Sequence, residues 1–257
     1  MAPELQDGEV LRAESIVKRF GALTALAGVT LTLRRGEVLG LIGDNGAGKS
    51  TLIKIITGFH RPDEGRLSID GKEVHLRSVS QARALGIQTV FQDLALVNEL
   101  SVFHNMFLNA EVVHRPIPFL NNRKMKQQTR QYLDDMGVRI PSIDSEVAQL
   151  SGGQRQAIAV ARSVYSKAKI LLLDEPLAAM GAKEGAMILD LVQRLKEKRD
   201  VSIILIAHNY AHVLEVCDRV NLLQHGRIAY DKPAQQTSVE ELTELVVAEY
   251  RKARETA

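Results

Sequence analysis

Two glycine-rich turns in this 257-residue chain have residue types and spacing that suit the binding of phosphate groups. The first, Gly43-Asp-Asn-Gly-Ala-Gly-Lys-Ser50, fits the pattern G-x-x-x-x-G-K-S/T. In such a turn backbone N–H groups point at phosphate oxygens, the lysine reaches the β- and γ-phosphates, and the hydroxyl is a ligand of Mg²⁺. The second, Leu150-Ser-Gly-Gly-Gln154, opens a helical pattern, where free N–H groups form an anion site. Either the second turn is a coincidence of composition, or the two turns contact the bound phosphates from two sides.

Two adjacent carboxylates follow a strongly apolar segment, Ile170-Leu-Leu-Leu-Asp174-Glu175-Pro176. Four apolar residues in a row predict a strand buried on both faces, so Asp174 emerges at its carboxyl end, where α/β proteins bind ligands. There Asp174 can hold the Mg²⁺ of Mg-ATP through water, and Glu175 can act as general base. The alternative is a core strand that ends in two surface acids, and the upstream phosphate-binding turn favours the catalytic interpretation.

The bulk composition is that of an ordinary globular protein, with 45% hydrophobic and 25% charged residues. The formal net charge of +2 is too small to indicate a nucleic-acid partner or an anionic membrane surface. Cys217, the single cysteine, cannot form an internal disulfide and is expected to be a buried spectator thiol. The first ten residues lack the apolar core of a secretory signal, and no apolar run approaches the roughly 20 residues of a membrane helix. We therefore expect a cytoplasmic protein whose membrane role, if any, comes through a partner.

Strands that alternate with helices must position these residues. Apolar runs predict strands over 29–33, 37–42, 87–91, 170–173, 202–206 and 220–223, with a hairpin over 65–76. Helical spacing predicts helices over 49–57, 155–165, 183–198 and 210–217. This alternation indicates an α/β fold with a mostly parallel sheet. Residues 92–165 contain helical patterns (101–109 and 122–136) but no convincing strand, which predicts a helical insertion, and Ser238-Val-Glu-Glu241 is a capping box that opens a final helix over 238–257.

The ordered set of motifs resembles the ATP-binding-cassette (ABC) ATPases. The set consists of the turn at 43–51, Gln92 after a strand, LSGGQ at 150–154, ILLLDEP at 170–176, and His208 after a strand. The resemblance covers nearly the whole chain. It implies one nucleotide-binding domain over residues 1–257, with a P-loop NTPase core, an antiparallel N-terminal β subdomain and the inserted helical subdomain.

The resemblance also implies ATP and Mg²⁺ as ligands, together with roles by position. The implied ATP-binding residues are Phe20, Gly43, Asp44, Asn45, Gly46, Ala47, Gly48, Lys49, Ser50, Thr51 and Gln92. The implied catalytic residues are Glu175, His208 and Lys49, and the implied metal ligands are Ser50, Gln92 and Asp174. Ser151, Gly152, Gly153 and Gln154 would contact the ATP of a partner subunit. Phe20 occupies the place of the aromatic residue that stacks on adenine, although its residue type alone predicts a core position.

Partners follow from the same resemblance. A chain with one of each turn needs a second cassette, most simply a homodimer, and acts on integral-membrane permease subunits at the inner face of the plasma membrane. A solute-binding protein would be an indirect partner, and no nucleic acid is expected. One departure is that Leu177 and Gly181 replace the family's usual threonine and aspartate, which puts the coupling between the two sites in doubt. Glycine there is similar to monosaccharide importers of the ribose, xylose and fructose type, in particular their single-cassette form; the alternatives are an importer of another substrate or a soluble ABC ATPase.

Overall fold

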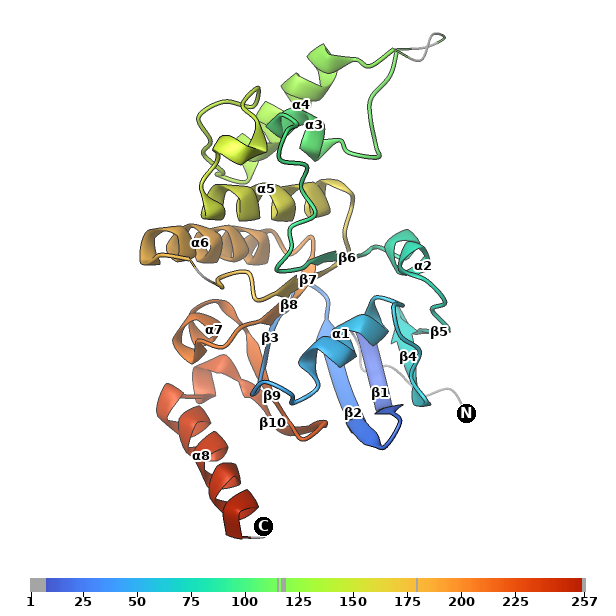
Figure 1. Ribbon diagram of the computed structural model, residues 1–257, viewed down its shortest axis with the longest axis vertical. Coiled ribbons are helices and arrows are strands. Elements are labelled where there is room, and N and C mark those ends of the chain that lie inside the picture. Colours follow the sequence, from blue (N-terminus) through green and yellow to red (C-terminus); the bar gives the residue numbers. More distant parts are fainter. Residues whose placement is uncertain (1–7, 115, 117–118, 179, 256–257) are drawn as a thin grey trace.

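A six-stranded sheet forms the centre of the computed structural model, which describes residues 8–114, 116, 119–178 and 180–255 (Figure 1). Its strands, in the spatial order β10-β9-β3-β8-β7-β6, are β3 (Val38–Ile42), β6 (Ile87–Val90), β7 (Ile170–Asp174), β8 (Ser202–Ile206), β9 (Arg219–Gln224) and β10 (Arg227–Pro233). All neighbours pair in parallel except β10, which runs antiparallel to β9. The continuous apolar runs of these parallel strands are explained by burial on both faces. The predicted α/β class is confirmed.

A second, antiparallel sheet has the order β2-β1-β4-β5. Its strands are β1 (Glu9–Phe20), β2 (Leu23–Arg34), β4 (Glu64–Ile69) and β5 (Lys72–Val74). The hairpin across Asp70-Gly71 was predicted, but β1 was not. The reason lies in β1 itself, where register shifts and a left-handed Ser15 (φ 51°) interrupt the alternation of apolar and polar residues. The helix α1 (Lys49–Ile56) lies against this sheet, and its apolar side chains share a core with β1, β2 and β3.

Six further helices contribute to a second core on the opposite side of the parallel sheet. They are α3 (Val102–Met106), α4 (Asn122–Asp135), α5 (Gly152–Tyr165), α6 (Ala182–Lys198), α7 (Tyr210–Val216) and α8 (Val239–Glu255). Figure 1 shows α3, α4 and α5 together at the end of the molecule farthest from the antiparallel sheet. Within the described part of residues 92–165, only two isolated bridges have strand character. A six-residue helix, α2 (Val79–Ala84), was not predicted because it is too short to show a helical period.

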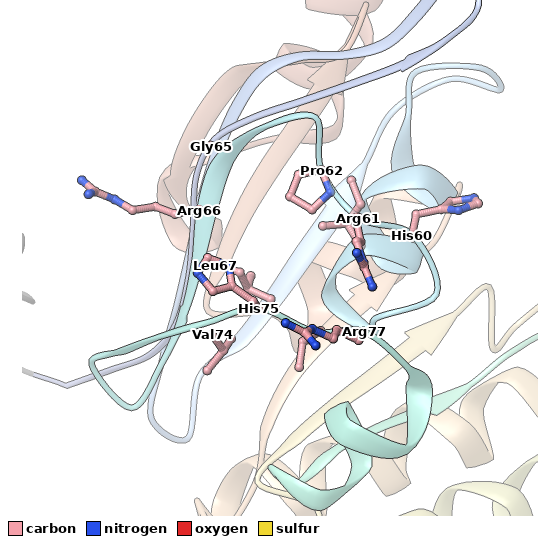
Figure 2. Close-up of a pocket in the computed structure, with 11 residues that line it drawn as sticks. His60, Arg61, Pro62, Gly65, Arg66, Leu67, Val74, His75 and Arg77 are labelled. Atoms are coloured by element: carbon pink, nitrogen blue, oxygen red, sulfur yellow. The ribbon is translucent and has the colours of Figure 1, made fainter.

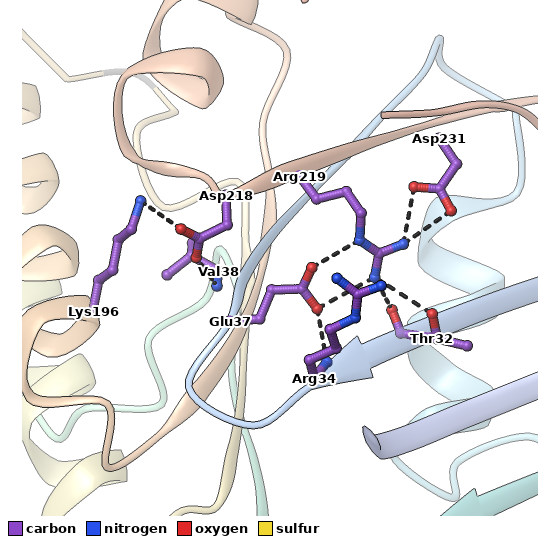
Figure 3. A network of polar contacts seen from close by, with 8 residues as sticks. All are labelled: Thr32, Arg34, Glu37, Val38, Lys196, Asp218, Arg219 and Asp231. Atoms are coloured by element: carbon purple, nitrogen blue, oxygen red, sulfur yellow. Dashed lines mark hydrogen bonds and ion pairs between the residues drawn. The ribbon is translucent and has the colours of Figure 1, made fainter. Parts of the chain in front are cut away.

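Arg219, at the start of β9, joins the two sheets through a buried polar network (Figure 3). Its Nε donates to Glu37 Oε1 at 2.7 Å, one terminal nitrogen donates to both carboxylate oxygens of Asp231 at 2.9 Å, and the other donates to the carbonyl oxygen of Thr32 at 2.6 Å. These partners come from the segment before β3, from β10 and from β2. Burial by itself would lower the pKa of Arg219, but the bonds from Glu37 and Asp231 outweigh it and raise that pKa. The network therefore fixes the beginning of β3, whose other end carries the first glycine-rich turn.

The final helix begins differently from the prediction. Ser238 Oγ accepts the N–H of Glu241 at 3.1 Å, as an N-cap does. The carboxylate of Glu241, however, accepts from the Tyr230 hydroxyl and from Lys232, both at 2.8 Å. These bonds to β10 take the place of the bond to the backbone of Ser238 that a capping box would add. The described helix ends at Glu255, and the last two residues of the predicted 238–257 helix lie outside the description.

Two expectations about apolar character are met. Cys217 is 5% exposed, and burial raises the pKa of its thiol well above the ordinary range. Of the helices in the described chain, none is both long and apolar enough to cross a membrane.

Candidate functional site

The carboxyl ends of four neighbouring strands deliver most of the predicted site residues to one edge of the parallel sheet. Residues 43–50 follow β3, His208 follows β8, the Asp174–Glu175 pair ends β7, and Gln92 follows β6. Because β3, β8, β7 and β6 are adjacent and parallel, these segments emerge side by side. This edge is where open α/β sheets bind ligands.

The first glycine-rich turn has backbone angles that only glycine accepts readily. Gly43 (φ 147°) and Gly48 (φ 110°) both lie in the left-handed half of conformational space. A Cβ on Gly43 would collide with the carbonyl oxygen of Leu223, and one on Gly48 would come within 2.6 Å of the carbonyl oxygen of Ala25. The turn is therefore pressed against β9 and β2, which fixes its backbone N–H groups at the N-terminus of α1.

Lys49 folds back over this turn. Its Nζ donates to the carbonyl oxygens of Gly43 at 2.5 Å and Asp44 at 3.0 Å, and the residue is only 6% exposed. Burial lowers the pKa of Lys49, while the charges of Glu175, Asp44 and Asp174 oppose that shift. A buried ammonium held by two carbonyls at a helix N-terminus is suited to exchange these partners for the oxygens of a bound phosphate.

Glu175 and His208 make a direct contact across two strands. Oε1 of Glu175 lies 2.7 Å from Nε2 of His208, and the backbone N–H of Glu175 donates to Ile206 on β8 at 3.0 Å. Glu175 itself has a left-handed backbone (φ 51°), which for a residue with a long side chain costs free energy. Such strain persists where the surroundings hold a side chain in a functional direction, and here it aims the Glu175 carboxylate at His208.

Asp174 can help to bind a divalent cation. Burial, and then the negative charge of Glu175, raise the pKa of Asp174, so a cation at this point would relieve both effects. The Ser50 hydroxyl and the Gln92 amide oxygen are hard oxygen donors of the type that Mg²⁺ accepts, and Mg²⁺ usually keeps several waters and substrate phosphates as further ligands. Across the described chain, no cluster of three or more His, Cys, Asp or Glu residues could hold a metal ion by itself. The residues present fit a cation that arrives with a phosphate ligand.

Glu175 lies between two cavities. One, of about 390 Å³, is lined by Gln92, Gly152, Arg155 and Glu175 among others. The other, of about 280 Å³, is lined by Glu175, His208, Asn209 and His212 among others. Sequence reasoning missed Arg155 and His212. Their sequence signals are weak: Arg155 directly follows the second glycine-rich turn, and His212 lies four residues after His208.

The second glycine-rich turn is a capped helix start, as predicted. Ser151 Oγ accepts the N–H of Gln154 at 3.3 Å, and Gln154 Oε1 accepts the N–H of Ser151 at 3.0 Å. Gly153 is required inside the subunit, since a Cβ there would come within 2.9 Å of side-chain atoms of Glu184 and Met187. The subunit itself does not require glycine at position 152, because the described atom nearest to a Cβ there would be 4.0 Å away.

The two turns do not meet within one chain. Helix α5, which begins at Gly152, contributes to the core on one side of the parallel sheet, whereas α1 contributes to the core on the other side. Figure 1 shows the same separation, with α5 near α3 and α4, and α1 beside the antiparallel sheet. Each turn is therefore open to a separate ligand or to a second molecule.

Phe20 is not a core residue, so the expectation from its residue type was wrong. It ends β1 and is 43% exposed. Its ring makes an edge contact with His60 at 5.3 Å between centroids, and Lys18 Nζ lies 5.5 Å from the ring centroid. An exposed ring supported at its edge remains available for stacking, which stays a prediction.

The positions that depart from the family pattern have different surroundings. Leu177 packs against the apolar core, which explains an apolar residue there. Gly181 is the exposed N-cap of α6 (φ −70°, ψ 163°), and a Cβ on it would meet no described atom within 4 Å. No described neighbour therefore requires glycine at position 181.

Comparison with known proteins agrees with this arrangement. A family model described as "ABC transporter" matches residues 26–178. The chain is 46% identical to the xylose/arabinose import ATP-binding protein XylG of Sulfolobus acidocaldarius, covering 93% of this chain and 94% of that protein. It is 43% identical to the fructose import ATP-binding protein FrcA of Rhizobium meliloti, covering 85% and 86%. Among solved structures, an ATP-binding cassette of an ABC transporter superposes with a TM-score of 0.81 at 28% identity, covering 94% of this chain and 98% of that one.

Proposed function

Since this chain belongs to the ABC transporter family and is an ATPase of that family, we propose that it is the ATP-hydrolysing subunit of a monosaccharide importer of the pentose or fructose type. The names of XylG and FrcA support this substrate class, because each is matched over at least 85% of this chain. Glycine at position 181, as in monosaccharide importers, also supports it.

The contact between Glu175 and His208 carries the proposed chemistry. ATP binds with its phosphates on residues 43–51, with Lys49 on the β- and γ-phosphates and Phe20 against the adenine. Bound Mg²⁺, held by Ser50, Asp174 and Gln92, would neutralise phosphate charge. Glu175 takes a proton from a water molecule; the oxygen of that water bonds to the γ-phosphorus as the bond to the β-phosphate oxygen breaks, giving ADP and phosphate. His208, 2.7 Å from Glu175, orients the carboxylate and contacts the γ-phosphate.

The working unit is a pair of cassettes, most simply two copies of this chain arranged head to tail. The separation of the two glycine-rich turns in one subunit supports this, since Ser151, Gly152, Gly153 and Gln154 then complete the ATP site of the partner. Open space at Gly152 also supports it, because a close approach by an outside phosphate explains a glycine that the subunit itself does not need. ATP binding closes the pair and hydrolysis reopens it.

The permease docks beside Gln92. A small cavity of about 70 Å³ is lined there by residues of four segments, among them Arg83, Phe91, Leu94 and Arg162. Phe91 is 41% exposed next to Gln92, and an exposed aromatic side chain beside a cavity suits the apolar face of a short helix. Through this contact the chain lies at the inner face of the plasma membrane, with the solute-binding protein as an indirect partner and no nucleic acid involved.

Transport in cells that lack the gene for this chain tests the proposal. Uptake of radiolabelled xylose, arabinose, ribose and fructose is measured with the chain restored and with its Glu175→Gln variant. Restored uptake of one of these sugars by the unmodified chain alone supports the proposal. Uptake of none of them, while the purified chain hydrolyses ATP, would assign the ATPase to a different cargo.

A further inference from the structure

A cavity of about 330 Å³ lies in the antiparallel subdomain, and none of the residues assigned to ATP binding or catalysis lines it (Figure 2). Three segments line it: the end of α1 with the loop that follows, the start of β4, and the end of β5 with the chain that leaves it. The lining residues are Ile55, His60, Arg61, Pro62, Gly65, Arg66, Leu67, Val74, His75, Leu76 and Arg77. Its volume lies within the range of small-molecule sites.

The lining combines an apolar floor with a cationic rim. Ile55, Leu67 and Leu76 are buried, and none of the lining residues is acidic. Arg66 is committed elsewhere: it pairs with Glu14 at 2.5 Å, and in Figure 2 its side chain points away from the cavity. Arg61 and Arg77 remain, and Figure 2 shows the nitrogen end of Arg61 directed toward Arg77.

These two arginines have no counter-ion in the described chain. Neither guanidinium group makes an ion pair or a hydrogen bond with any residue that the structure describes; the backbone N–H of Arg77 donates to Gln81 Oε1 at 2.8 Å. The carboxylates close to them in sequence are already paired: Asp63 with Lys18 at 2.8 Å and Glu64 with Arg19 at 2.8 Å. Glu73, the remaining acid nearby, lies 3.5 Å from His75. Two guanidinium groups at one cavity thus carry a charge of about +2 that no acid of the lining neutralises.

We propose that this cavity binds a small organic phosphate monoester, with the phosphate between Arg61 and Arg77 and the apolar body on Ile55, Leu67 and Leu76. A phosphate monoester carries about −1.5 to −2 charges at neutral pH and accepts hydrogen bonds from two guanidinium groups, whereas a carboxylate carries one charge. The floor favours an organic phosphate over the free ion. This site lies outside the proposed catalytic machinery and goes beyond the proposed function.

The cavity also touches the nucleotide site through two residues. Ile55 belongs to α1, which begins at Lys49, and the ring of His60 contacts the ring of Phe20 at 5.3 Å. A ligand that orders His60 would change the support of the ring proposed to stack on adenine. Linkage then requires that the phosphate monoester and ATP change each other's affinity by the same factor.

Calorimetry with the whole chain tests this site. The chain is first saturated with Mg-ADP, so that residues 43–51 are filled, and is then titrated with phenyl phosphate, phenol, benzoate and inorganic phosphate. We expect phenyl phosphate to bind best and the other three to bind at least tenfold more weakly, because each lacks part of the anion or the apolar body.

Three single variants locate the binding. Arg61→Gln and Arg77→Gln each weaken phenyl phosphate binding about tenfold, because each removes charge-assisted hydrogen bonds. Arg123→Gln changes an exposed arginine on α4 that pairs with no residue of the described chain, and it leaves phenyl phosphate binding unchanged. Far-UV circular dichroism confirms that all three variants are folded. Equal binding by all three variants, or equal affinity for phenyl phosphate and phenol, would overturn the proposal and leave Arg61 and Arg77 as solvated surface charges.

Discussion

His208 and Glu175, which are 33 positions apart in the chain, meet at 2.7 Å between Nε2 and Oε1 at the ends of two adjacent strands. Neither residue is fully buried, since their side chains are 46% and 30% exposed. The contact holds the carboxylate of Glu175 in one direction while its oxygens stay open to water. A general base needs both properties, a fixed position and access to the proton that it removes.

Replacing Glu175 by Gln should stop turnover without preventing ATP binding. Gln is nearly isosteric and can keep a hydrogen bond to His208, but it cannot accept a proton from water. We expect phosphate release to fall by at least about 100-fold. Size-exclusion chromatography in Mg-ATP should show a dimer that persists. Glu215→Gln, on the exposed surface of α7, is the matched control and should keep normal turnover; a similar rate in both variants would remove Glu175 from its role.

Mixing two inactive variants should restore activity if the turns complete each other's sites. Lys49→Ala damages the first turn, and Gly152→Asp places a negative charge at the second. Each homodimer should be inactive, but a mixed dimer contains one site with both turns intact. Random pairing of equal amounts then gives about one quarter of the unmodified ATPase rate. No recovery in the mixture, with both variants folded and able to exchange subunits, would show that the two turns do not complete one site between subunits.

Asp174→Asn should stabilise the nucleotide-free chain and weaken its response to Mg-ATP. The pKa of Asp174 is raised above its ordinary value of 3.8 in the folded state, by burial and then by Glu175. The folded chain therefore binds the proton more tightly, so this group's contribution to stability falls as the pH rises above 3.8 and passes through the raised pKa.

Asparagine carries no charge, so Asp174→Asn removes this loss of stability at neutral pH. Because the carboxylate is partly solvated, we expect the melting temperature to rise by only about 1–3 °C. The extra rise caused by Mg-ATP should shrink, because a metal-binding oxygen is lost. Asp190→Asn, an exposed change on α6, should alter neither value. A fall in melting temperature at pH 7 would contradict the sign of the effect.

Arg219→Met should destabilise the chain more than the loss of any surface ion pair does. It leaves the carboxylate of Glu37, whose side chain is 6% exposed, buried without its guanidinium partner. Removing one member of a buried ion pair costs about 3–5 kcal/mol of unfolding free energy. Urea unfolding measures this loss. Arg35→Met removes a surface pair with Asp70 and should change little, while adding Glu37→Leu to Arg219→Met should recover part of the loss.

Gly181→Asp should be accepted by the fold. The backbone at this N-cap (φ −70°, ψ 163°) suits aspartate, and the described chain leaves room for a Cβ. Aspartate at an N-cap exceeds glycine by only a few tenths of a kcal/mol, so thermal unfolding should show equal or slightly higher stability. If the aspartate of related cassettes couples two sites, the Hill coefficient of ATP hydrolysis should rise. A clear loss of stability would show that position 181 requires glycine for a reason not visible in the single chain.

Several elements could be read from local patterns. The turn at 43–50, the strand over 170–173 and the helix capped by Ser151 each carry their signal within about ten residues, as glycines, apolar runs or a cap. The strand β10 was missed because its sequence, Arg227–Pro233, ends in Asp-Lys-Pro and has only Ile228 and Tyr230 as an apolar alternation. Such residues are tolerated because β10 is an edge strand, which only the sheet order reveals.

The sequence by itself determined the set of phosphate-binding and acidic motifs, their order, and the α/β class, because steric limits on glycine and the burial of apolar runs act between near neighbours. Only the tertiary structure decided which of these residues meet. The 2.7 Å contact of Glu175 with His208 follows from β7 and β8 being adjacent and parallel, and the network of Arg219 joins residues up to 187 positions apart. The exposure of Phe20 and the cavity at Arg61 and Arg77 likewise depend on how separate segments pack, since the fold, and not the separation in sequence, sets the distances between them.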